Sequence, residues 1–161
     1  VVVSSIAHRF GEIALDDLMS ENDYTPTKAY AQSKLANLMF ALELDRRLQA
    51  AGCKAVCIAC HPGYSSTNLQ STGPRGLFSL LYKLANPLLA QSAAAGAIPT
   101  VLAAAGKEAQ RGGYYGPQKM SEARGPVSDA SVASRALDRE VAEKLWHASE
   151  ELIGEPFNLP G

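Results

Sequence analysis

Tyr30 and Lys34 are the residues whose types and spacing could do chemistry. They lie four positions apart, in a run without glycine or proline that extends from Ala29 to Ala51. On a helix this spacing puts both side chains on one face, one turn apart. A tyrosine titrates near pH ~10, but a cation one turn away favours the phenolate. The pair therefore predicts proton exchange with a hydroxyl or carbonyl, with a solvated helix face as the alternative interpretation.

The segments around this pair predict an α/β fold. Val1–Ser5 is typical of a buried strand, and it ends in two serines. Thr25 followed by Pro26 indicates a capped helix start, and the helix is expected to run to about Ala51. Lys54–Cys60 is the next apolar strand. A strand, a helix and another strand predict a parallel sheet with right-handed crossovers.

The other segments predict a mixture of loops and further elements. In chain order, we expect a loop over 6–25 with a short helical turn at 15–19, a loop over 64–74, helices over 76–89 and 92–105, a last strand over 112–116, a polar loop over 118–128 and a helix over 130–153. No repeat and no linker divides the chain, so residues 1–161 are expected to form one domain.

Composition excludes several classes of function. The chain has 161 residues, a net charge of −1 and no basic run, so we expect neither nucleic acid nor an anionic membrane surface as a partner. No apolar stretch reaches the ~18 residues of a membrane span, and the N-terminus lacks the basic flank of a signal peptide. The odd number of cysteines, clustered in one segment, favours a reducing cytoplasm over a disulfide framework.

Cys57-Ile58-Ala59-Cys60-His61 fits the pattern of a c-type haem attachment site. The surrounding run is short and apolar, however, and is typical of a buried strand. Residues three apart on a strand point to opposite faces, so Cys57 and Cys60 are not expected to hold one cofactor. We therefore predict no haem and no metal site.

Three features occur in an order that favours a shared site. Ser5 ends the first strand, Tyr30 lies on the helix that follows, and Pro62-Gly63 comes directly after the second strand. In an open parallel sheet, ligands bind at the carboxyl ends of the strands. We therefore expect these residues to meet at one edge of the sheet. His8 follows the serines and is expected to be an exposed loop residue, with substrate contact as the alternative.

This arrangement resembles the short-chain dehydrogenase/reductase family. The residues that carry the resemblance are Val3-Ser4-Ser5, Tyr30-Ala31-Gln32-Ser33-Lys34, and Pro62-Gly63 with Thr67 beyond. A further set resembles the retinol dehydrogenase-like subgroup: Ser5-Ile6-Ala7-His8, Ser33-Lys34-Leu35-Ala36-Asn37 and His61-Pro62-Gly63. The resemblance extends through Gly113-Tyr114-Tyr115 to Leu145-Trp146 and so covers nearly the whole chain.

The resemblance implies a doubly wound, Rossmann-like parallel sheet and hydride transfer between NAD or NADP and a carbonyl or alcohol. Tyr30 matches the catalytic acid/base. Lys34 matches the lysine that favours the phenolate and bonds the nicotinamide ribose. Ser5 matches the serine that holds the substrate oxygen, with adjacent Ser4 as its rival for that role.

The resemblance also implies cofactor contacts after the second strand. Pro62, Gly63 and Tyr64 match backbone that borders the nicotinamide, and Thr67 matches a hydroxyl that contacts the cofactor amide or phosphate. The family places its variable substrate-binding helix at 76–89, and the leucines there suit an apolar small-molecule substrate, although core packing explains them equally well.

The family's glycine-rich dinucleotide turn has no counterpart in residues 1–161. Val1 would correspond to the fifth strand of the family's sheet, so we expect a C-terminal portion without the first strands. We expect the isolated chain to be inactive. The alternative is a non-catalytic binding or scaffold protein with a degenerate Rossmann-like fold. The choice of NAD or NADP, the substrate and the direction stay open, and the helix from Pro26 could pair with a copy of itself in a homo-oligomer.

Overall fold

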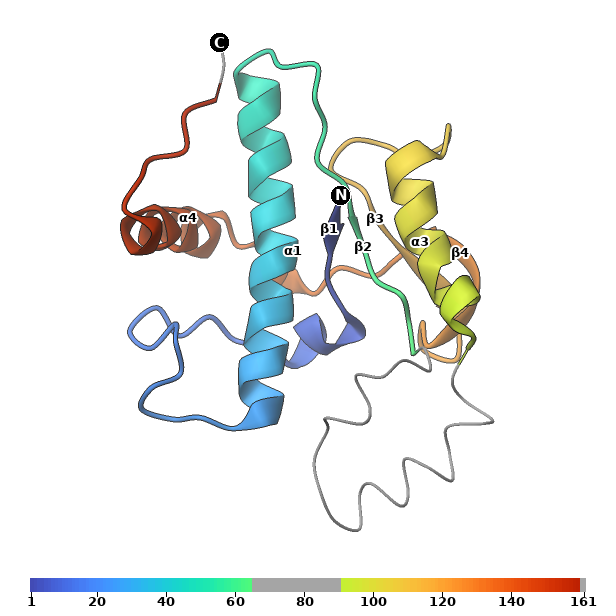
Figure 1. Ribbon diagram of the computed structural model, residues 1–161, viewed down its shortest axis with the longest axis horizontal. Coiled ribbons are helices and arrows are strands. Elements are labelled where there is room, and N and C mark those ends of the chain that lie inside the picture. Colours follow the sequence, from blue (N-terminus) through green and yellow to red (C-terminus); the bar gives the residue numbers. More distant parts are fainter. Residues whose placement is uncertain (65–90, 160–161) are drawn as a thin grey trace.

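The described part of the chain folds around a four-stranded sheet with helices on both faces. The computed structural model describes residues 1–64 and 91–159. The strands lie in the order β1 (Val2–Val3), β2 (Ala59–Cys60), β3 (Tyr114–Lys119) and β4 (Arg124–Asp129). The first three are parallel, and β4 is antiparallel to β3. Figure 1 shows α1 (Pro26–Ala50) and α4 (Arg139–Ile153) to one side of the strands and α3 (Ala93–Ala105) to the other. This arrangement confirms the doubly wound α/β fold.

The long helix α1 begins and ends as its sequence predicts. The Thr25 side chain accepts a hydrogen bond from the Lys28 N–H, and Pro26 occupies the first helical position, where no N–H is needed. Gly52 follows the helix with a φ of +68°, a left-handed conformation that favours glycine. Leucines and a methionine on the inner face of α1 are at most 1% exposed: Leu35, Leu38 and Met39.

The sheet separates two cores. Cys57 packs in the core shared with α1 and α4, whereas Cys60 packs in the core beneath α3. Tyr114 and Tyr115 divide between the same two cores. The prediction that Cys57 and Cys60 point to opposite faces is therefore confirmed. Burial raises the pKa of both thiols and so disfavours the thiolate that metal ligation needs.

The first strand differs from its prediction. It was expected to be buried, but Val1 and Val3 are 54% and 41% exposed. The reason is that β1 lies at the edge of the sheet, while α3 packs over β2 and β3. The helical turn expected at 15–19 does not form, and this stretch contains turns without a helix. The helical segment of this loop is instead the 3₁₀ helix η1 (Ile6–Phe10).

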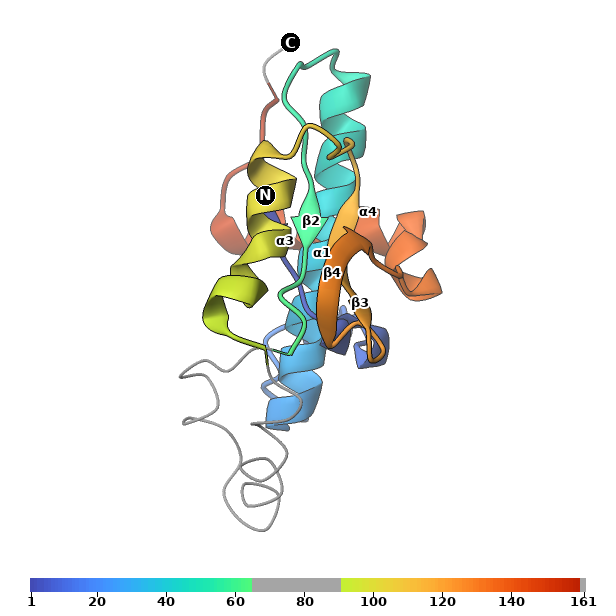
Figure 2. The same cartoon turned by 90° about the vertical axis from the view of Figure 1, so that its right-hand side faces the viewer.

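The prediction of a polar loop over 118–128 is wrong. Strand β3 extends to Lys119, and β4 returns beside it from Arg124 as a hairpin, which faces the viewer in Figure 2. An edge strand with one side in solvent can be almost wholly polar, because backbone pairing rather than apolar alternation holds it. The sequence pattern therefore carried no strand signal.

The helix predicted over 130–153 begins nine residues later, at Arg139. The backbone N–H groups of Ser131 and Ala133 donate to side chains of other elements, so this stretch stays extended. The 3₁₀ helix η3 (Ser134–Leu137) follows, and Asp138 then caps the start of α4. Tertiary hydrogen bonds thus replace the first two turns of the predicted helix.

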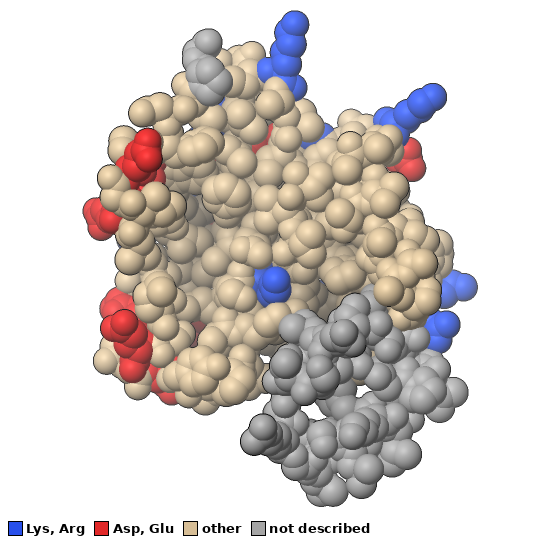
Figure 3. All heavy atoms as spheres, in the orientation of Figure 1, with Lys and Arg blue, Asp and Glu red and all other residues tan. Residues whose placement is uncertain are grey.

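Basic side chains are dispersed on the visible face of the protein. On the face drawn in Figure 3, the Lys and Arg side chains stand apart and form no continuous basic patch. Among the residues that the structure describes, no helix is long and apolar enough to cross a membrane. The same residues contain no group of His, Cys, Asp and Glu that could hold a metal ion.

A buried carboxylate connects α1 to the two inner strands. Asp45 is 5% exposed, and its Oδ1 accepts the Cys57 N–H at 2.9 Å. Its Oδ2 lies 3.3 Å from Nε of Arg111, in the turn before β3. This contact could not be predicted from the sequence, because an acidic residue on an amphipathic helix is usually solvated.

Asp45→Ala should lower the free energy of unfolding by about 2 kcal/mol, because the buried Cys57 N–H loses its acceptor. Asp45→Asn should lose less, since the amide oxygen can still accept that bond. Urea unfolding measures the difference, with the exposed Asp16→Ala as control. If Asp45→Ala unfolds no more easily than Asp16→Ala, the hydrogen bond from Cys57 to Asp45 contributes nothing to stability.

Candidate active site

Tyr30 and Lys34 lie together on the first turns of α1, as predicted. The Lys34 Nζ is 5.5 Å from the centroid of the Tyr30 ring. Tyr30 is 40% exposed, and Lys34 is half-buried. Within the described parts of the chain, neither the Tyr30 hydroxyl nor the Lys34 ammonium has a hydrogen-bond partner. Residues 1–64 and 91–159 therefore leave both polar groups without a partner.

The end of β1 is bonded directly to this part of α1. The Ser4 hydroxyl donates to the Lys34 carbonyl oxygen at 2.7 Å. One helical turn further on, the Asn37 side-chain amide donates to the Val3 carbonyl oxygen at 3.0 Å. Together these bonds set the position of the Tyr30–Lys34 pair relative to the end of the strand.

Gln32, between the two site residues, holds the loop that precedes α1. Its side-chain oxygen accepts the Ala14 N–H at 2.8 Å, and its amide group donates to the Leu18 carbonyl at 3.2 Å. The end of η1 packs just as closely against the helix, because a Cβ at Gly11 would lie 2.4 Å from the Ala31 carbonyl oxygen. The segment after Ser5 is thus fixed on α1 beside Tyr30.

The two serines have different surroundings. Ser4 is 2% exposed, and its hydroxyl is already committed to the Lys34 carbonyl. Ser5 is half-buried, and its Oγ accepts the Ala7 N–H at 3.2 Å at the start of η1. Accepting that bond leaves the Ser5 hydroxyl hydrogen free to donate. The geometry therefore favours Ser5 over Ser4 as the residue that meets a substrate oxygen.

The backbone predicted to border the cofactor lies at the same edge of the sheet. The Ser4 N–H donates to the Cys60 carbonyl oxygen at 2.8 Å, which aligns the ends of β1 and β2. Gly63 has a φ of +67°, and a Cβ there would lie 2.5 Å from the Ala123 carbonyl oxygen. The adjacent Tyr64 N–H donates to that same oxygen at 2.7 Å.

Some predicted features lie outside the described residues. They are Thr67, most of the loop predicted over 64–74 and the helix predicted over 76–89, and these stay predictions.

His61 is fully buried beside this backbone. Its Nδ1 accepts the Gly63 N–H at 3.1 Å, so its Nε2 carries the proton and donates to the Glu122 carboxylate at 3.1 Å. Burial lowers the pKa of His61 to about 4 in spite of the nearby carboxylate. The ring also backs directly onto Gly116, where a Cβ would lie 2.0 Å from Nε2.

Glu122 was missed by the sequence analysis, because it lies in the stretch interpreted as a polar loop. Its Oε1 accepts both the N–H and the hydroxyl of Ser131, at 2.9 and 2.6 Å. Its Oε2 lies 2.5 Å from the Arg9 guanidinium. Burial acts to raise the pKa of this carboxyl, but the Ser131 hydrogen bonds and Arg9 outweigh it and hold the pKa below the usual range.

The prediction of an exposed His8 is wrong. His8 is fully buried, its Nδ1 donates to the Ser5 carbonyl at 2.7 Å, and its Nε2 accepts the Ala133 N–H at 3.2 Å. Its ring meets the edge of Tyr114 with centroids 5.5 Å apart. Burial is the main cause that lowers the pKa of His8. The available signal in the sequence for a role near the site was its position three residues after Ser5.

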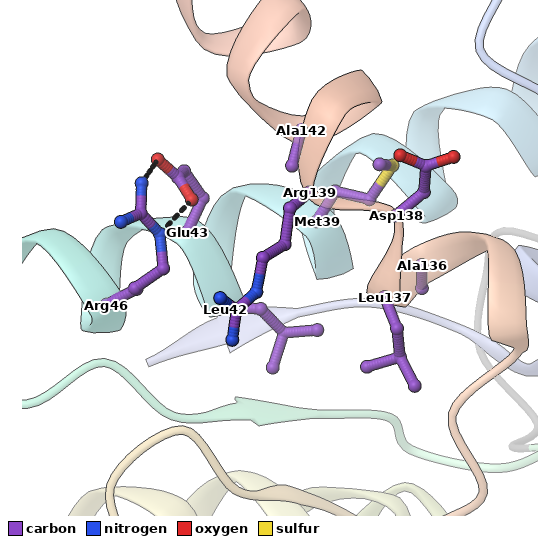
Figure 4. A pocket seen from close by; sticks show the side chains of 9 residues that line it. All are labelled: Met39, Leu42, Glu43, Arg46, Ala136, Leu137, Asp138, Arg139 and Ala142. Carbon is purple, nitrogen blue, oxygen red and sulfur yellow. Dashed lines mark hydrogen bonds and ion pairs between the residues drawn. The ribbon is translucent and has the colours of Figure 1, made fainter.

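A hollow elsewhere on α1 contains none of the predicted site residues. Figure 4 shows it between α1, η3 and α4, where the Arg46 side chain turns back to pair with Glu43. Its lining is Met39, Leu42, Glu43, Arg46, Ala136, Leu137, Asp138, Arg139 and Ala142. We therefore take the edge of the sheet, rather than this hollow, as the candidate site.

The fold and the placement of these residues define a Rossmann-like α/β protein with its candidate site at the carboxyl edge of the sheet. No protein-family model matches the chain. Human retinol dehydrogenase 12 is 36% identical over 156 residues, which cover 96% of this chain and 45% of that protein. A short-chain dehydrogenase/reductase of Penicillium roqueforti is 33% identical over 160 residues, covering 95% and 46%.

A solved structure agrees with these relatives. The crystal structure of an uncharacterized protein from Mycobacterium paratuberculosis matches with a TM-score of 0.74 and 36% identity, over 98% of this chain and 50% of that one. The chain is similar along nearly its whole length to members of the short-chain dehydrogenase/reductase family, and the predicted resemblance to this family and its retinol dehydrogenase-like members is confirmed. It spans about half the length of the curated relatives it matches.

Stability should fall as the pH drops from about 6.5 towards 4. The pKa of His61 is lower in the folded state, so over this range the unfolded chain binds a proton that the folded protein does not. The loss should reach at most about 1.4 kcal/mol per pH unit for one histidine, and His8, whose pKa is also lowered, adds to it.

Urea unfolding between about pH 7.5 and 5 measures this loss, in a range where carboxyl groups stay ionised. His147→Gln is the control, because His147 is exposed on α4 and its replacement should leave the slope unchanged. A free energy of unfolding that does not change over this range would contradict the prediction.

Proposed function

We propose that this chain forms the catalytic part of an oxidoreductase that transfers hydride between NAD or NADP and a carbonyl or alcohol. The observation that carries the proposal is the Tyr30–Lys34 pair, whose polar groups have no other partner among the described residues. Ser4, the residue before Ser5, donates to the Lys34 carbonyl at the end of β1, in a chain related to dehydrogenases.

Tyr30 is the acid/base in this proposal. In carbonyl reduction its hydroxyl gives a proton to the substrate oxygen, and in alcohol oxidation the phenolate takes that proton back. The Lys34 ammonium lies on the same face of α1, 5.5 Å from the centroid of the Tyr30 ring, and places a positive charge beside the group that exchanges the proton. The Ser5 hydroxyl donates a hydrogen bond to the same substrate oxygen and stabilises the charge that develops there.

The residues present fit a nicotinamide cofactor. When bound, the cofactor supplies or accepts the hydride, and the protein contributes positioning and the proton. The ammonium of Lys34 and the hydroxyl of Tyr30 are donors that suit the ribose next to the nicotinamide. The backbone of Pro62, Gly63 and Tyr64 would border the ring, and Thr67 would reach the cofactor amide or phosphate.

The activity is proposed for the protein at its natural length. Residues 1–161 contain no glycine-rich dinucleotide turn, and the chain spans about half the length of its relatives. We infer that such a turn is supplied together with this chain and that the 161 residues alone do not turn over. A measurable reductase rate from a purified chain of only these residues would contradict this inference.

An apolar substrate is favoured by two observations. The human relatives are named for retinol, an apolar alcohol. The stretch over 76–89 is rich in leucine and contains Phe78, although its structure is outside the described residues.

A non-catalytic scaffold is the second candidate, supported by the absence of a glycine-rich turn in residues 1–161. It gives no reason, however, for a tyrosine and a lysine held together with their polar groups unused.

Tyr30→Phe should lower kcat by at least about 100-fold, because the ring stays in place but its transferable proton is lost. Cofactor binding, measured by titration calorimetry, should persist. Tyr24→Phe is the matched control, since Tyr24 is an exposed tyrosine just before α1. A Tyr30→Phe enzyme that keeps normal turnover would show that another group moves the proton.

Ser5→Ala and Ser4→Ala should separate the roles of the two serines. Ser5→Ala should reduce kcat by about 100-fold or more through the loss of a donor to the substrate oxygen, with a loss of stability of only about 1 kcal/mol as the cap of η1. Ser4→Ala should chiefly lower the free energy of unfolding, because the hydrogen bond from the buried Ser4 to the Lys34 carbonyl is lost. If Ser5→Ala is fully active, Ser5 does not hold the substrate.

A further inference from the structure

The two strand ends that form the candidate site are joined by a buried polar network. His8 on η1 donates to the Ser5 carbonyl, and the next residue, Arg9, pairs with Glu122. Glu122 in turn accepts a hydrogen bond from His61, whose other ring nitrogen accepts the Gly63 N–H. Polar contacts, joined by the peptide bond between His8 and Arg9, therefore connect the end of β1 to the backbone after β2.

Glu122 is the central member of this network. Its carboxylate makes four contacts: with Arg9, with His61, and with the N–H and hydroxyl of Ser131. Its side chain is 11% exposed and that of Arg9 is 27% exposed. Because burying a charge is costly unless it is paired and hydrogen-bonded, removing one partner would leave the others unsatisfied and free to shift.

The backbone that carries Glu122 is strained. Met120, Ser121 and Glu122 have φ values of +53°, +55° and +68°, a left-handed conformation that side chains disfavour. The turn brings the next carbonyl, that of Ala123, against the Tyr64 N–H and close to Gly63. Strain of this kind persists only where the surrounding structure maintains it, and it is concentrated at functional sites.

We propose that Glu122 is a positioning residue that sets where the nicotinamide ring sits. Glu122 acts through His61, whose Nδ1 accepts the Gly63 N–H. The turn that contains Glu122 also places the Ala123 carbonyl oxygen, which accepts the Tyr64 N–H. Its pairing with Arg9 keeps this backbone in register with the Ser5 end of β1. The inference rests on the proposed function, in which Pro62, Gly63 and Tyr64 border the nicotinamide.

The experiment compares two ligands on the natural-length protein. One is the reduced cofactor that the protein uses, NADH or NADPH, and the other is its counterpart without nicotinamide, ADP-ribose or 2′-phospho-ADP-ribose. Glu122→Gln should weaken the affinity for the reduced cofactor about tenfold. It should change the affinity for the nicotinamide-free ligand by no more than about twofold. The emission of the bound reduced nicotinamide should also shift towards that of the free cofactor.

Glu43→Gln is the matched control. Glu43 is 4% exposed and pairs with Arg46 and Arg47, so this change also removes a buried carboxylate from an ion pair, but away from the site. It should leave the ratio of the two affinities unchanged. Should Glu122→Gln fail to fold, Arg9→Lys and Arg9→Met provide the second comparison, in which Lys retains the cation and should restore nicotinamide binding relative to Met.

The outcomes are distinguishable. If the unmodified protein binds neither reduced cofactor, the proposed function fails, and this inference fails with it. If the unmodified protein binds and turns over but Glu122→Gln matches it, only the role of Glu122 is refuted. Equal weakening of both ligands would also refute it, because that result indicates a general structural defect.

Discussion

The seating of α1 on the end of β1 is the constraint on which the candidate site depends. Two hydrogen bonds hold it, from the Ser4 hydroxyl to the Lys34 carbonyl and from the Asn37 amide to the Val3 carbonyl. Both use backbone oxygens as acceptors, so neither consumes the side chains of Tyr30 and Lys34. Because Ser4 also donates its N–H to the Cys60 carbonyl, one residue places α1, β1 and β2 at the same edge of the sheet.

Two buried histidines extend this constraint beyond the helix. His8 and His61 are fully buried, and each uses both ring nitrogens, one as a donor and one as an acceptor. This pattern suits neutral imidazole, since the protonated ring has no acceptor, and burial lowers the pKa of both. His8 therefore connects the backbone of Ser5 to that of Ala133, and His61 connects the backbone of Gly63 to the Glu122 carboxylate. Tyr114 lies between their rings, at centroid distances of 5.5 and 5.3 Å.

Local signals in the sequence predicted the elements whose causes are themselves local. Thr25 and Pro26 mark the start of α1 because capping and the missing proline N–H act within one turn. The opposite orientations of Cys57 and Cys60 follow from the two-residue period of a strand. The hairpin of β3 and β4 could not be predicted in this way, because a polar edge strand is recognisable only from the strand that pairs with it. The late start of α4 has the same origin, since side chains of distant elements bind the backbone before it.

The sequence by itself determined the family resemblance, the order of strand, helix and strand, and the pairing of Tyr30 with Lys34 on one face of α1. These follow from spacing within single elements, where the geometry of four residues along a helix is enough. Only the tertiary structure gave Ser4 and Ser5 different surroundings, buried His8, and gathered Arg9, His61 and Glu122 into one network. The physical reason is that a hydrogen bond between elements depends on how they pack, and residues more than fifty positions apart carry no periodic signal of their contact.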